Sequence, residues 1–324
     1  MKKTKSNLFK AAWSSSLIFF VITVSLAFWN CSNVCEVKNG RQPEFTVPDK
    51  MPEVKYLQFL ALGDFGTGDT GQFDVASGMA EKTRVDSVEF TLLLGDNFYE
   101  NGVKSFDDEQ FQSKFEEVYN SPSLQVPFYA VLGNHDHRGN AEAQVEYTGI
   151  SKRWKMPARF YTFILTIDDS TEVQFFALDT NPIAEGEAEA AEQIAWLKSE
   201  LDKSRARWKI AFGHHPLYSG GYHGNDKETL TMRARLEPIL EPAIDLYLSG
   251  HDHDQQLIKP LDKRLHYIVS GAGAKCRDVE WKDGTIYAGT NLGFAWFRLS
   301  HHELLIEFLT AAGELDYAYM IAKD

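Results

Sequence analysis

Five apolar segments of the chain each end in a glycine, and side chains that can bind a metal ion or carry a proton follow at once. The pattern recurs at 63–66 (GDFG), 95–99 (GDNFY), 133–137 (GNHDH), 213–215 (GHH) and 250–253 (GHDH). Seven of these side chains offer oxygen or ring-nitrogen ligands: Asp64, Asp96, Tyr99, Asn134, His214, His251 and His253. Mixed nitrogen and oxygen ligands suit transition metals, whereas calcium binds oxygen alone. The motifs therefore predict a transition-metal site.

Each motif by itself has a simpler interpretation. Gly-Asp after a strand is typical of a plain turn, because both residues suit turns, and His-Asp-His fits a solvated loop. The histidines argue against that interpretation for the whole set, since seven of the 10 in the chain fall in or near the motifs: His135, His137, His214, His215, His223, His251 and His253. We therefore expect the motifs to act together.

The number of candidate ligands suggests two metal ions. Seven protein ligands suit two six-coordinate ions that share one bridging carboxylate, with water completing each shell. Metal ions roughly 3.5–4 Å apart activate a water molecule and stabilise the attacking and leaving oxygens of an in-line displacement. Phosphoryl transfer is the common use of such a pair, because it depends mainly on positioning and charge neutralisation.

The elements that must position these side chains alternate between strands and helices. The apolar runs before the glycines are typical of buried strands, and helical periodicity is found at 72–85, 105–119, 187–203 and 227–240. This alternation predicts an α/β fold with a mostly parallel sheet, in which ligands bind beyond the carboxyl ends of the strands. The five motifs should then converge at one sheet edge. We expect the last third of the chain to form a second sheet, packed on the first within one catalytic domain, 54–324.

The N-terminal part of the chain differs from the rest. Four lysines in residues 1–10 precede a largely apolar stretch of 19 residues at 11–29, the arrangement of an export signal. The alternative is an uncleaved anchor, because a segment of this length can just span a bilayer. Cys31 follows directly and is a candidate for lipidation. We assign 1–30 to the signal or anchor and 31–53, which is polar and has three prolines, to a tether.

The composition of the chain limits the kinds of molecule that it is expected to bind. The chain of 324 residues has a net charge of −13 at pH 7, which argues against binding to nucleic acids or anionic membranes. An anionic substrate must then be attracted by a local positive centre. The three cysteines allow one disulfide at most and have no zinc-ligand spacing. We expect a monomer that acts on small molecules, with any membrane contact made through the N-terminal segment or a lipid at Cys31.

The motifs resemble those of the purple acid phosphatases, and most of all the small, animal-type, tartrate-resistant form. The likeness covers about residues 56–275 and extends beyond the ligands to the segments 133–161 and 270–273. Other two-metal phosphoesterases commonly carry Asp-x-His in the first motif, whereas Gly66 occupies that histidine position here and Tyr99 supplies a ligand instead. The resemblance implies an α/β fold of two packed mixed β-sheets flanked by helices, the four-layer metallophosphoesterase sandwich, with metals at the carboxyl ends of strands.

The resemblance also implies a role for each candidate residue. Fe(III) would be held by Asp64, Tyr99 and His253. A divalent iron, zinc or manganese ion would be held by Asn134, His214 and His251, and the two ions would be bridged by Asp96. His135 and His223 would contact the phosphate and protonate the leaving oxygen. A phenolate is a hard anionic ligand that favours Fe(III), and a tyrosine loses its proton near neutral pH only beside a strong cation.

Four other polar residues of the motifs are expected to support the site. Asn97 should shape its turn, and Asp136 and His137 should orient neighbouring groups rather than bind metal. His215 should line the pocket.

The expected function is that of an exported acid phosphatase. Its expected location is the periplasm, the cell surface as a lipoprotein, or the medium as a secreted protein. A hydroxide held by the metal pair would attack a small phosphate monoester, and nucleotides and phosphoproteins are further candidate substrates. Two alternatives use the same residues: a phosphodiesterase or nucleotide-cleaving enzyme, and a redox-active iron protein that generates reactive oxygen species. Specificity among the hydrolases should depend on loops such as 138–160 and 216–228.

Overall fold

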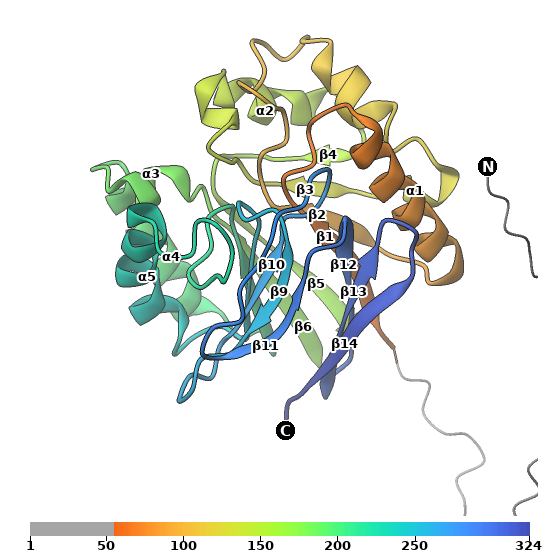
Figure 1. Ribbon diagram of the computed structural model, residues 1–324. Helices are drawn as coiled ribbons and strands as arrows, with labels where there is room; N and C mark the ends of the chain where they lie inside the picture. Colours follow the sequence, from red (N-terminus) through yellow and green to blue (C-terminus); the bar gives the residue numbers. More distant parts are fainter. Residues whose placement is uncertain (1–54) are drawn as a thin grey trace, which may run out of the picture. The chain divides into compact units, whose positions relative to one another are not determined.

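Two seven-stranded mixed β-sheets form the framework of residues 55–324, the part of the chain that this computed structural model describes (Figure 1). The first sheet has, in spatial order, β14 (Leu315–Ala322), β13 (Glu303–Thr310), β12 (Gly293–Leu299), β1 (Leu57–Leu62), β2 (Phe90–Leu93), β3 (Phe128–Ala130) and β4 (Trp154–Lys155). The second has β11 (Thr285–Gly289), β9 (Gln255–Ile258), β10 (His266–Ser270), β8 (Leu246–Ser249), β7 (Trp208–Phe212), β6 (Thr171–Ala177) and β5 (Tyr161–Asp168). The signal or anchor and the tether expected at 1–53 lie outside the described residues.

Both sheets contain a run of parallel strands with antiparallel neighbours at one or both sides. Strands β1 to β4 run parallel to one another, as do β6, β7, β8 and β10. The C-terminal strands belong to the first sheet, because β12 pairs antiparallel with β1 in a register that sets Phe59 opposite Phe297. The expectation that the C-terminal third forms the second sheet is therefore wrong for β12, β13 and β14. The expected class, α/β with two packed mixed sheets, is confirmed.

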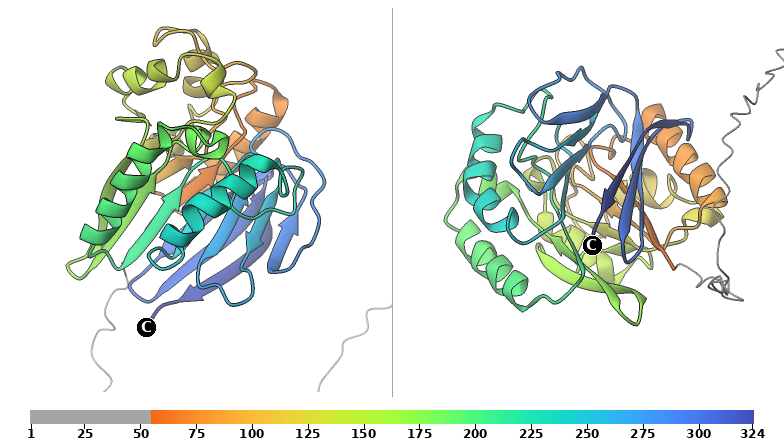
Figure 2. Two further views of the ribbon diagram at one scale, coloured as in Figure 1. Left: turned by 90° about the vertical axis from the view of Figure 1, so that its left-hand side faces the viewer. Right: turned by 90° about the horizontal axis from the view of Figure 1, so that it is seen from below.

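Helices cover the outer faces of the two sheets, which gives four layers (Figure 2). α1 (Thr70–Val85) lies against the first sheet, where Lys82 pairs with Glu307 on β13 and lies over the ring of Trp296 on β12. The second sheet is covered by α3 (Asn181–Glu185), α4 (Ala190–Lys203) and α5 (Lys227–Leu240). The short α2 (Ala141–Glu146) follows the third motif. Within residues 55–324, no helix is long and apolar enough to cross a bilayer.

Three of the four expected helices are present, and the fourth is mostly replaced by turns. Between 105 and 119, only one π-helical turn forms, at Gln112–Glu116. The side chain of Asp108 accepts hydrogen bonds from the backbone N–H groups of Lys104 (2.9 Å) and Gln110 (3.0 Å), and the second of these is the bond that an N-cap residue makes, so the helical part begins only after Asp108. The apolar spacing still serves the core, since Phe111 and Phe115 are buried.

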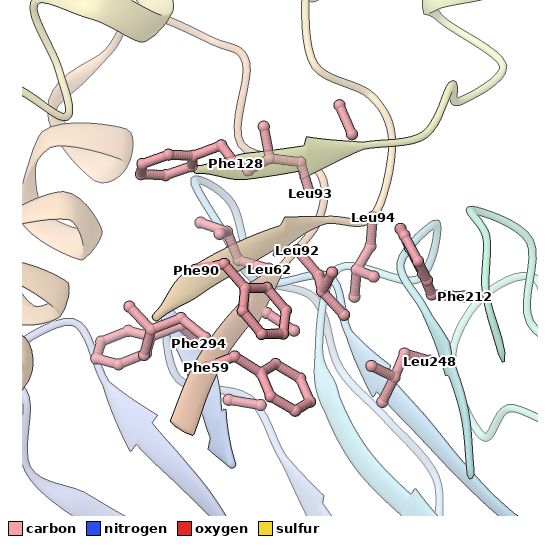
Figure 3. Close-up of a cluster of buried hydrophobic side chains, with 14 of the residues drawn as sticks. Phe59, Leu62, Phe90, Leu92, Leu93, Leu94, Phe128, Phe212, Leu248 and Phe294 are labelled. Atoms are coloured by element: carbon pink, nitrogen blue, oxygen red, sulfur yellow. The ribbon is translucent and has the colours of Figure 1, made fainter. Parts of the chain in front are cut away.

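The core between the two sheets holds them face to face (Figure 3). Phe59 on β1 stacks on Phe90 of β2 and Phe297 of β12, with ring centroids 4.9 and 4.6 Å apart. Across the interface, its ring meets Phe175 of β6 edge-on at 5.5 Å. These rings are removed from water, so the hydrophobic effect fixes the relative position of the sheets and brings the carboxyl ends of β1 and β8 together.

Candidate metal centre

The loops that follow five strands meet at one place. Three of these strands, β1, β2 and β3, belong to the first sheet, whereas β7 and β8 belong to the second. Backbone hydrogen bonds join the loops within each group: Asp64 N–H donates to Gly95 O (3.0 Å), and Gly250 N–H donates to His214 O (3.0 Å). The motifs therefore converge, but at the adjoining edges of two sheets and not at the edge of one, as expected from the sequence.

Three residues of these loops have a backbone conformation that is unusual outside glycine. Asp64, Asp96 and His251 have φ angles of 58°, 53° and 70°, and they are three of the four non-glycine residues with positive φ in residues 55–324. Such strain costs about 1–3 kcal/mol and clusters at functional sites. Backbone donors hold the carboxylates in place, since His251 N–H donates to Asp64 Oδ2 (2.8 Å) and His135 N–H to Asp96 Oδ1 (2.9 Å).

Two of the motif glycines leave room for the carboxylates. A Cβ atom at Gly133 would lie 2.2 Å from Asp96 Oδ1, and one at Gly250 would lie 2.4 Å from Asp64 Oδ2. Both distances are far shorter than a van der Waals contact. Any larger residue at either position would therefore displace a carboxylate of the cluster.

The seven candidate ligands of the sequence prediction lie together in two adjoining groups. In the first group, Tyr99 Oη lies 3.0 Å from Asp64 Oδ1 and 3.3 Å from His253 Nε2. His253 Nε2 also lies 3.5 Å from Asp64 Oδ1. One carboxylate, one phenol and one imidazole thus point at a common position.

In the second group, His214 Nε2 lies 3.1 Å from Asn134 Oδ1 and 3.2 Å from His251 Nδ1. Asp96 adjoins both groups: its Oδ1 lies 3.5 Å from His214 Nε2, and its charge adds to burial and to the charge of Asp64 in raising the pKa of the Tyr99 phenol. Ligand atoms of Asp64, Asp96 and His214 all lie within 4.8 Å of one another. The arrangement offers two neighbouring positions for a metal ion, with Asp96 between them.

The electrostatics of the cluster fit a bound cation. Asp64 and Asp96 are both buried, and burial followed by the charge of Asp96 raises the pKa of Asp64 well above its ordinary value. Burial, and then these two carboxylates, raises the pKa of Tyr99 as well. A metal ion would offset the desolvation and the repulsion, and it would lower these pKa values. The protein therefore buries acidic groups where only a positive partner stabilises their charged forms.

The histidines present unprotonated nitrogens to the cluster. His214 Nδ1 lies 2.9 Å from the carbonyl oxygen of Leu94, which can only accept, so Nδ1 carries the proton and Nε2 keeps its lone pair. Such a carbonyl contact commonly orients a metal-binding histidine. Burial lowers the pKa of His214, of His251 and of His253, the last to about 4, and favours neutral rings. His253 Nδ1 is buried without a hydrogen-bond partner.

Other motif residues support the cluster, as the sequence predicted for three of them. The buried Asp136 carboxylate accepts hydrogen bonds from the N–H groups of Gly133 (2.8 Å) and Asn97 (3.0 Å) and so joins the third motif to the second. The Asn97 side chain donates to Val131 O (2.8 Å) and takes no part in the ligand cluster. His137 Nε2 lies 2.8 Å from Asp179 Oδ1.

His215 does not line the pocket, contrary to the prediction. Its side chain is buried behind the cluster, where its ring centroid lies 4.6 Å from that of His251. Its Nδ1 lies 2.9 Å from Thr180 Oγ1, and the same hydroxyl accepts from His214 N–H (3.1 Å). His215 therefore supports the position of two candidate ligands from within the core.

A cavity of about 550 Å³ opens over the cluster, and both predicted catalytic histidines line it. His223 Nδ1 lies 2.7 Å from Asp226 Oδ2, and its ring centroid lies 4.1 Å from that of His251. His135 Nδ1 lies 2.7 Å from the carbonyl oxygen of Glu100, so it donates there and leaves Nε2 on the side of Asp96, 4.0 Å from Oδ2. In both rings one nitrogen is held by the protein and the other remains for a ligand.

The sequence prediction missed several residues that line the same cavity. Four of them are large or basic side chains: Arg138, Tyr222, Lys275 and Arg277. The first two lie in the loops 138–160 and 216–228 that were expected to determine specificity, but the prediction named neither residue. Arg138 follows the third motif directly, and its charge in a chain of net charge −13 was an available signal. Lys275 and Arg277 lie more than 20 positions after the last motif, and no local pattern connects them with it.

Comparison with known proteins supports a metal-dependent phosphatase site at this position. Residues 57–255, which include all seven candidate ligands, match the calcineurin-like phosphoesterase family. The chain is 33% identical to purple acid phosphatase 17 of Arabidopsis thaliana over 353 aligned positions, covering 100% of this chain and 98% of the relative. It is 33% identical to human tartrate-resistant acid phosphatase type 5, covering 80% of this chain and 88% of the relative.

A solved structure is similar over the same region. GAP50, described as the anchor in the inner membrane complex of Plasmodium, superposes with a TM-score of 0.73 at 26% identity, covering 83% of this chain and 90% of that one. The fold, the grouped ligands and the relatives all agree with the resemblance seen in the motifs. The chain belongs to the purple acid phosphatases of the calcineurin-like phosphoesterase family, and it is a metal-dependent phosphatase.

Proposed function

We propose that the protein is an acid phosphatase that hydrolyses phosphate monoesters with two metal ions, Fe(III) and a divalent iron, zinc or manganese ion. The observation that carries this proposal is a phenol within the ligand cluster, with Tyr99 Oη 3.0 Å from Asp64 Oδ1 and 3.3 Å from His253 Nε2. Hard, anionic oxygen ligands favour a highly charged ion, and a buried phenol becomes phenolate only beside one.

The two groups of the cluster supply the ligands. In this proposal, Fe(III) is held by Asp64, Tyr99 and His253. The divalent ion is held by Asn134, His214 and His251, and the carboxylate of Asp96 is shared by the two ions. When bound, such a pair supplies an activated water and neutralises charge on the phosphoryl group.

The two histidines of the cavity act on the substrate directly. Asp226 accepts from His223 Nδ1 and fixes its ring, so Nε2 is the nitrogen that holds a proton for the leaving oxygen. Glu100 O fixes His135 in the same way, so its Nε2 donates to an oxygen of the phosphoryl group. Both rings line the cavity that also contains candidate ligands.

The first test is a visible absorption spectrum of the purified protein, with metal analysis and a phosphatase assay on the same sample. A visible charge-transfer band and one iron plus one further metal per chain would support the proposal, together with faster hydrolysis of 4-nitrophenyl phosphate than of bis(4-nitrophenyl) phosphate. A colourless, active protein with two zinc or manganese ions would disprove the iron assignment. Faster cleavage of the diester would favour the phosphodiesterase alternative.

Export is a separate part of the proposal and rests on the sequence of residues 1–31. The basic and apolar pattern would direct export, with lipidation at Cys31 as one outcome and cleavage or anchoring as the others. Mass spectrometry of the mature N-terminus, combined with cell fractionation, distinguishes the three. We also propose that the protein is a monomer, which sedimentation of the mature chain would test.

A further inference from the structure

Asp252 belongs to the last motif, yet its carboxylate bonds to a different part of the chain. It lies between the candidate ligands His251 and His253 in the sequence. Its side chain is buried, and both of its oxygens accept hydrogen bonds from the loop 219–226, which carries His223. The same short motif therefore supplies two candidate ligands and holds the loop of the proposed proton donor.

Three points of this loop depend on the Asp252 carboxylate. Asp252 Oδ1 accepts from the backbone N–H of His223 (2.8 Å), and Asp252 Oδ2 accepts from the hydroxyl group of Ser219. The Ser219 oxygen accepts in turn from the N–H of Gly221 (2.9 Å). Hydrogen bonds to a carboxylate are charge-assisted and roughly twice as strong as those between neutral groups, so the two bonds to Asp252 attach the loop firmly.

Gln256, on β9, completes the attachment. Its Oε1 accepts from the N–H of Gly220 (2.7 Å), and its Nε2 donates to Ser219 Oγ (2.9 Å) and to Asp254 Oδ1 (2.6 Å). We call Asp252, Ser219 and Gln256 the loop clamp. All three side chains are buried, so the low local dielectric strengthens their hydrogen bonds.

The loop needs this support, because three of its eight residues are glycines: Gly220, Gly221 and Gly224. Glycine has more accessible backbone conformations than other residues, so a glycine-rich loop does not fix its own shape. At Gly221 the backbone lies directly against the clamp, since a Cβ atom there would be 2.5 Å from Asp252 Cγ. The conformation of the loop is therefore set by what it contacts.

The other contacts of the loop do not replace the clamp. The segment 280–282 holds the first two residues of the loop through their carbonyl oxygens. Thr229 on α5 donates to the carbonyl oxygen of His223 (2.8 Å), and Asp226 binds the His223 ring, but both lie on the C-terminal side of the same segment. Within residues 55–324, the hydrogen bonds to Asp252 are those that join the loop to a motif with candidate ligands.

We propose that the residues of the loop clamp are positioning residues for His223, which place its ring where it protonates the leaving oxygen. This inference rests on the proposed function, in which His223 Nε2 is the proton donor. The rings of His223 and His251 have centroids 4.1 Å apart, and Asp252 is joined to His251 by a peptide bond and to His223 by a hydrogen bond. The clamp thus fixes the distance between the donor and the candidate ligands. A displacement of about 1 Å in an active site costs about 10²-fold in rate.

The expected effect of the clamp depends on the leaving group. As the bond between phosphorus and the leaving oxygen breaks, the oxygen of water forms the new bond to phosphorus, and the proton on His223 Nε2 passes to the leaving oxygen. One proton of the water then returns to His223, and the other stays on the phosphate product. A weakly basic leaving group departs without the donated proton, whereas a more basic one needs it. A misplaced His223 should therefore slow mainly the second kind of substrate.

The test compares Ser219→Ala with the native chain on 4-nitrophenyl phosphate and on phenyl phosphate, whose leaving group is more basic. General acid catalysis contributes about 10²–10⁴-fold, and we expect kcat for phenyl phosphate to fall at least about tenfold while that for 4-nitrophenyl phosphate falls less than about threefold. KM should change little for either ester. Equal falls of kcat for the two esters, or no fall, would overturn the inference.

Two further substitutions control for a general loss of structure. Ser219→Thr keeps the hydroxyl group and should restore the native ratio of the two rates. Ser300→Ala is the matched control, because Ser300 is a buried serine in the turn between β12 and β13 whose hydroxyl also accepts from backbone N–H groups. It should change neither rate. A change in the ratio of the two rates in Ser300→Ala would count against the clamp.

A double variant shows whether Ser219 acts through His223. His223→Asn removes the proposed donor, so Ser219→Ala should have no further effect on phenyl phosphate in that background. A loss by the same factor in both backgrounds would overturn the inference, because Ser219 would then act independently of His223. Loss of metal from Ser219→Ala would overturn it as well, because the clamp would then serve the ligands.

Hydrogen exchange separates this inference from the proposed function, because it needs no turnover. The amides of 219–226 should exchange at least about tenfold faster in Ser219→Ala than in the native chain, since they lose their protection, whereas those of 95–99 should be unchanged. Unchanged exchange at 219–226 would refute the clamp. A native protein that hydrolyses neither ester would refute the proposed function, and the exchange rates would still decide whether the clamp holds the loop.

Discussion

Tyr99 and Asp64 are 35 positions apart in the sequence, yet the phenol oxygen of Tyr99 lies 3.0 Å from Asp64 Oδ1. The contact joins the loop after β2 to the loop after β1 and places a phenol among buried carboxylates. Without a cation this arrangement disfavours ionisation, since burial and the carboxylates raise the pKa of Tyr99. The pair is therefore best explained by a positive ion that both oxygens would contact.

Tyr99→Phe tests the role of this phenol. Removal of the oxygen should abolish the visible band and lower the iron content, because the remaining ligands no longer favour Fe(III). The matched control is Tyr267→Phe, which also removes a buried hydroxyl, one that has no hydrogen-bond partner. The control should keep the band and the iron. A Tyr99→Phe protein with an unchanged spectrum would show that the phenol is not a ligand.

Asp96→Asn should separate metal binding from folding. Asp96 adjoins both ligand groups, so its loss should reduce kcat by at least about 10³-fold when the metal pair is lost. In the metal-free protein the same change should leave the melting temperature equal or higher, because it removes a charge that repels buried Asp64. Thermal melting with and without a chelator measures both effects, and exposed Asp169→Asn is the control. A lower melting temperature of the metal-free variant would contradict the repulsion argument.

Gly133→Ala tests whether the glycine of the third motif is required for space. Its Cβ atom would lie 2.2 Å from Asp96 Oδ1 and 2.3 Å from the backbone nitrogen of Asp96, so Asp96 must move, and a displacement of about 1 Å in an active site costs about 10²-fold in rate. Gly149→Ala is the matched control, since no atom lies within 4 Å of the added Cβ there. Steady-state kinetics should show the loss in the first variant alone. Equal activity of the two variants would mean that the carboxylate has room to move.

Local patterns identified the candidate ligands that the structure brings together, but not the way in which the sheets are assembled. Each motif follows its own strand directly, so the sequence around Asp96 or His214 contains the information that the prediction needs. The pairing of β1 with β12 depends on which apolar faces meet, as in the stack of Phe59 on Phe297, and those residues are distant in sequence. No periodicity within one segment reports such a contact.

The same limit explains why the helix expected at 105–119 is mostly absent and why the basic residues of the cavity were not predicted. The spacing of Phe111 and Phe115 suits a helix, but the Asp108 side chain accepts the N-cap hydrogen bond from Gln110 N–H, so the helical part begins only after Asp108. Arg277 reaches the cavity because its backbone pairs with that of His253. That hydrogen bond becomes visible only when the loop is folded onto the last motif.

The buried His266 of β10 should make the fold sensitive to acid at a position remote from the metal centre. Burial, and then the charge of Lys259, lowers the pKa of His266 from 6.5 to about 4. Between these pH values the unfolded chain binds a proton that the folded chain excludes. The free energy of unfolding should therefore fall as the pH decreases from about 6.5 to about 4, by up to about 3 kcal/mol from this residue.

His266→Gln isolates that contribution, because glutamine is polar but does not titrate. Urea unfolding at several pH values between 4 and 7 should give a shallower loss of stability for the variant than for the native chain. The candidate ligands His214, His251 and His253 also resist protonation when no metal is bound, so the difference between the two proteins is the relevant quantity. Exposed His302→Gln should follow the native profile. If His266→Gln also follows the native profile, the ring of His266 takes up its proton in the folded protein and does not contribute to the acid sensitivity of the fold.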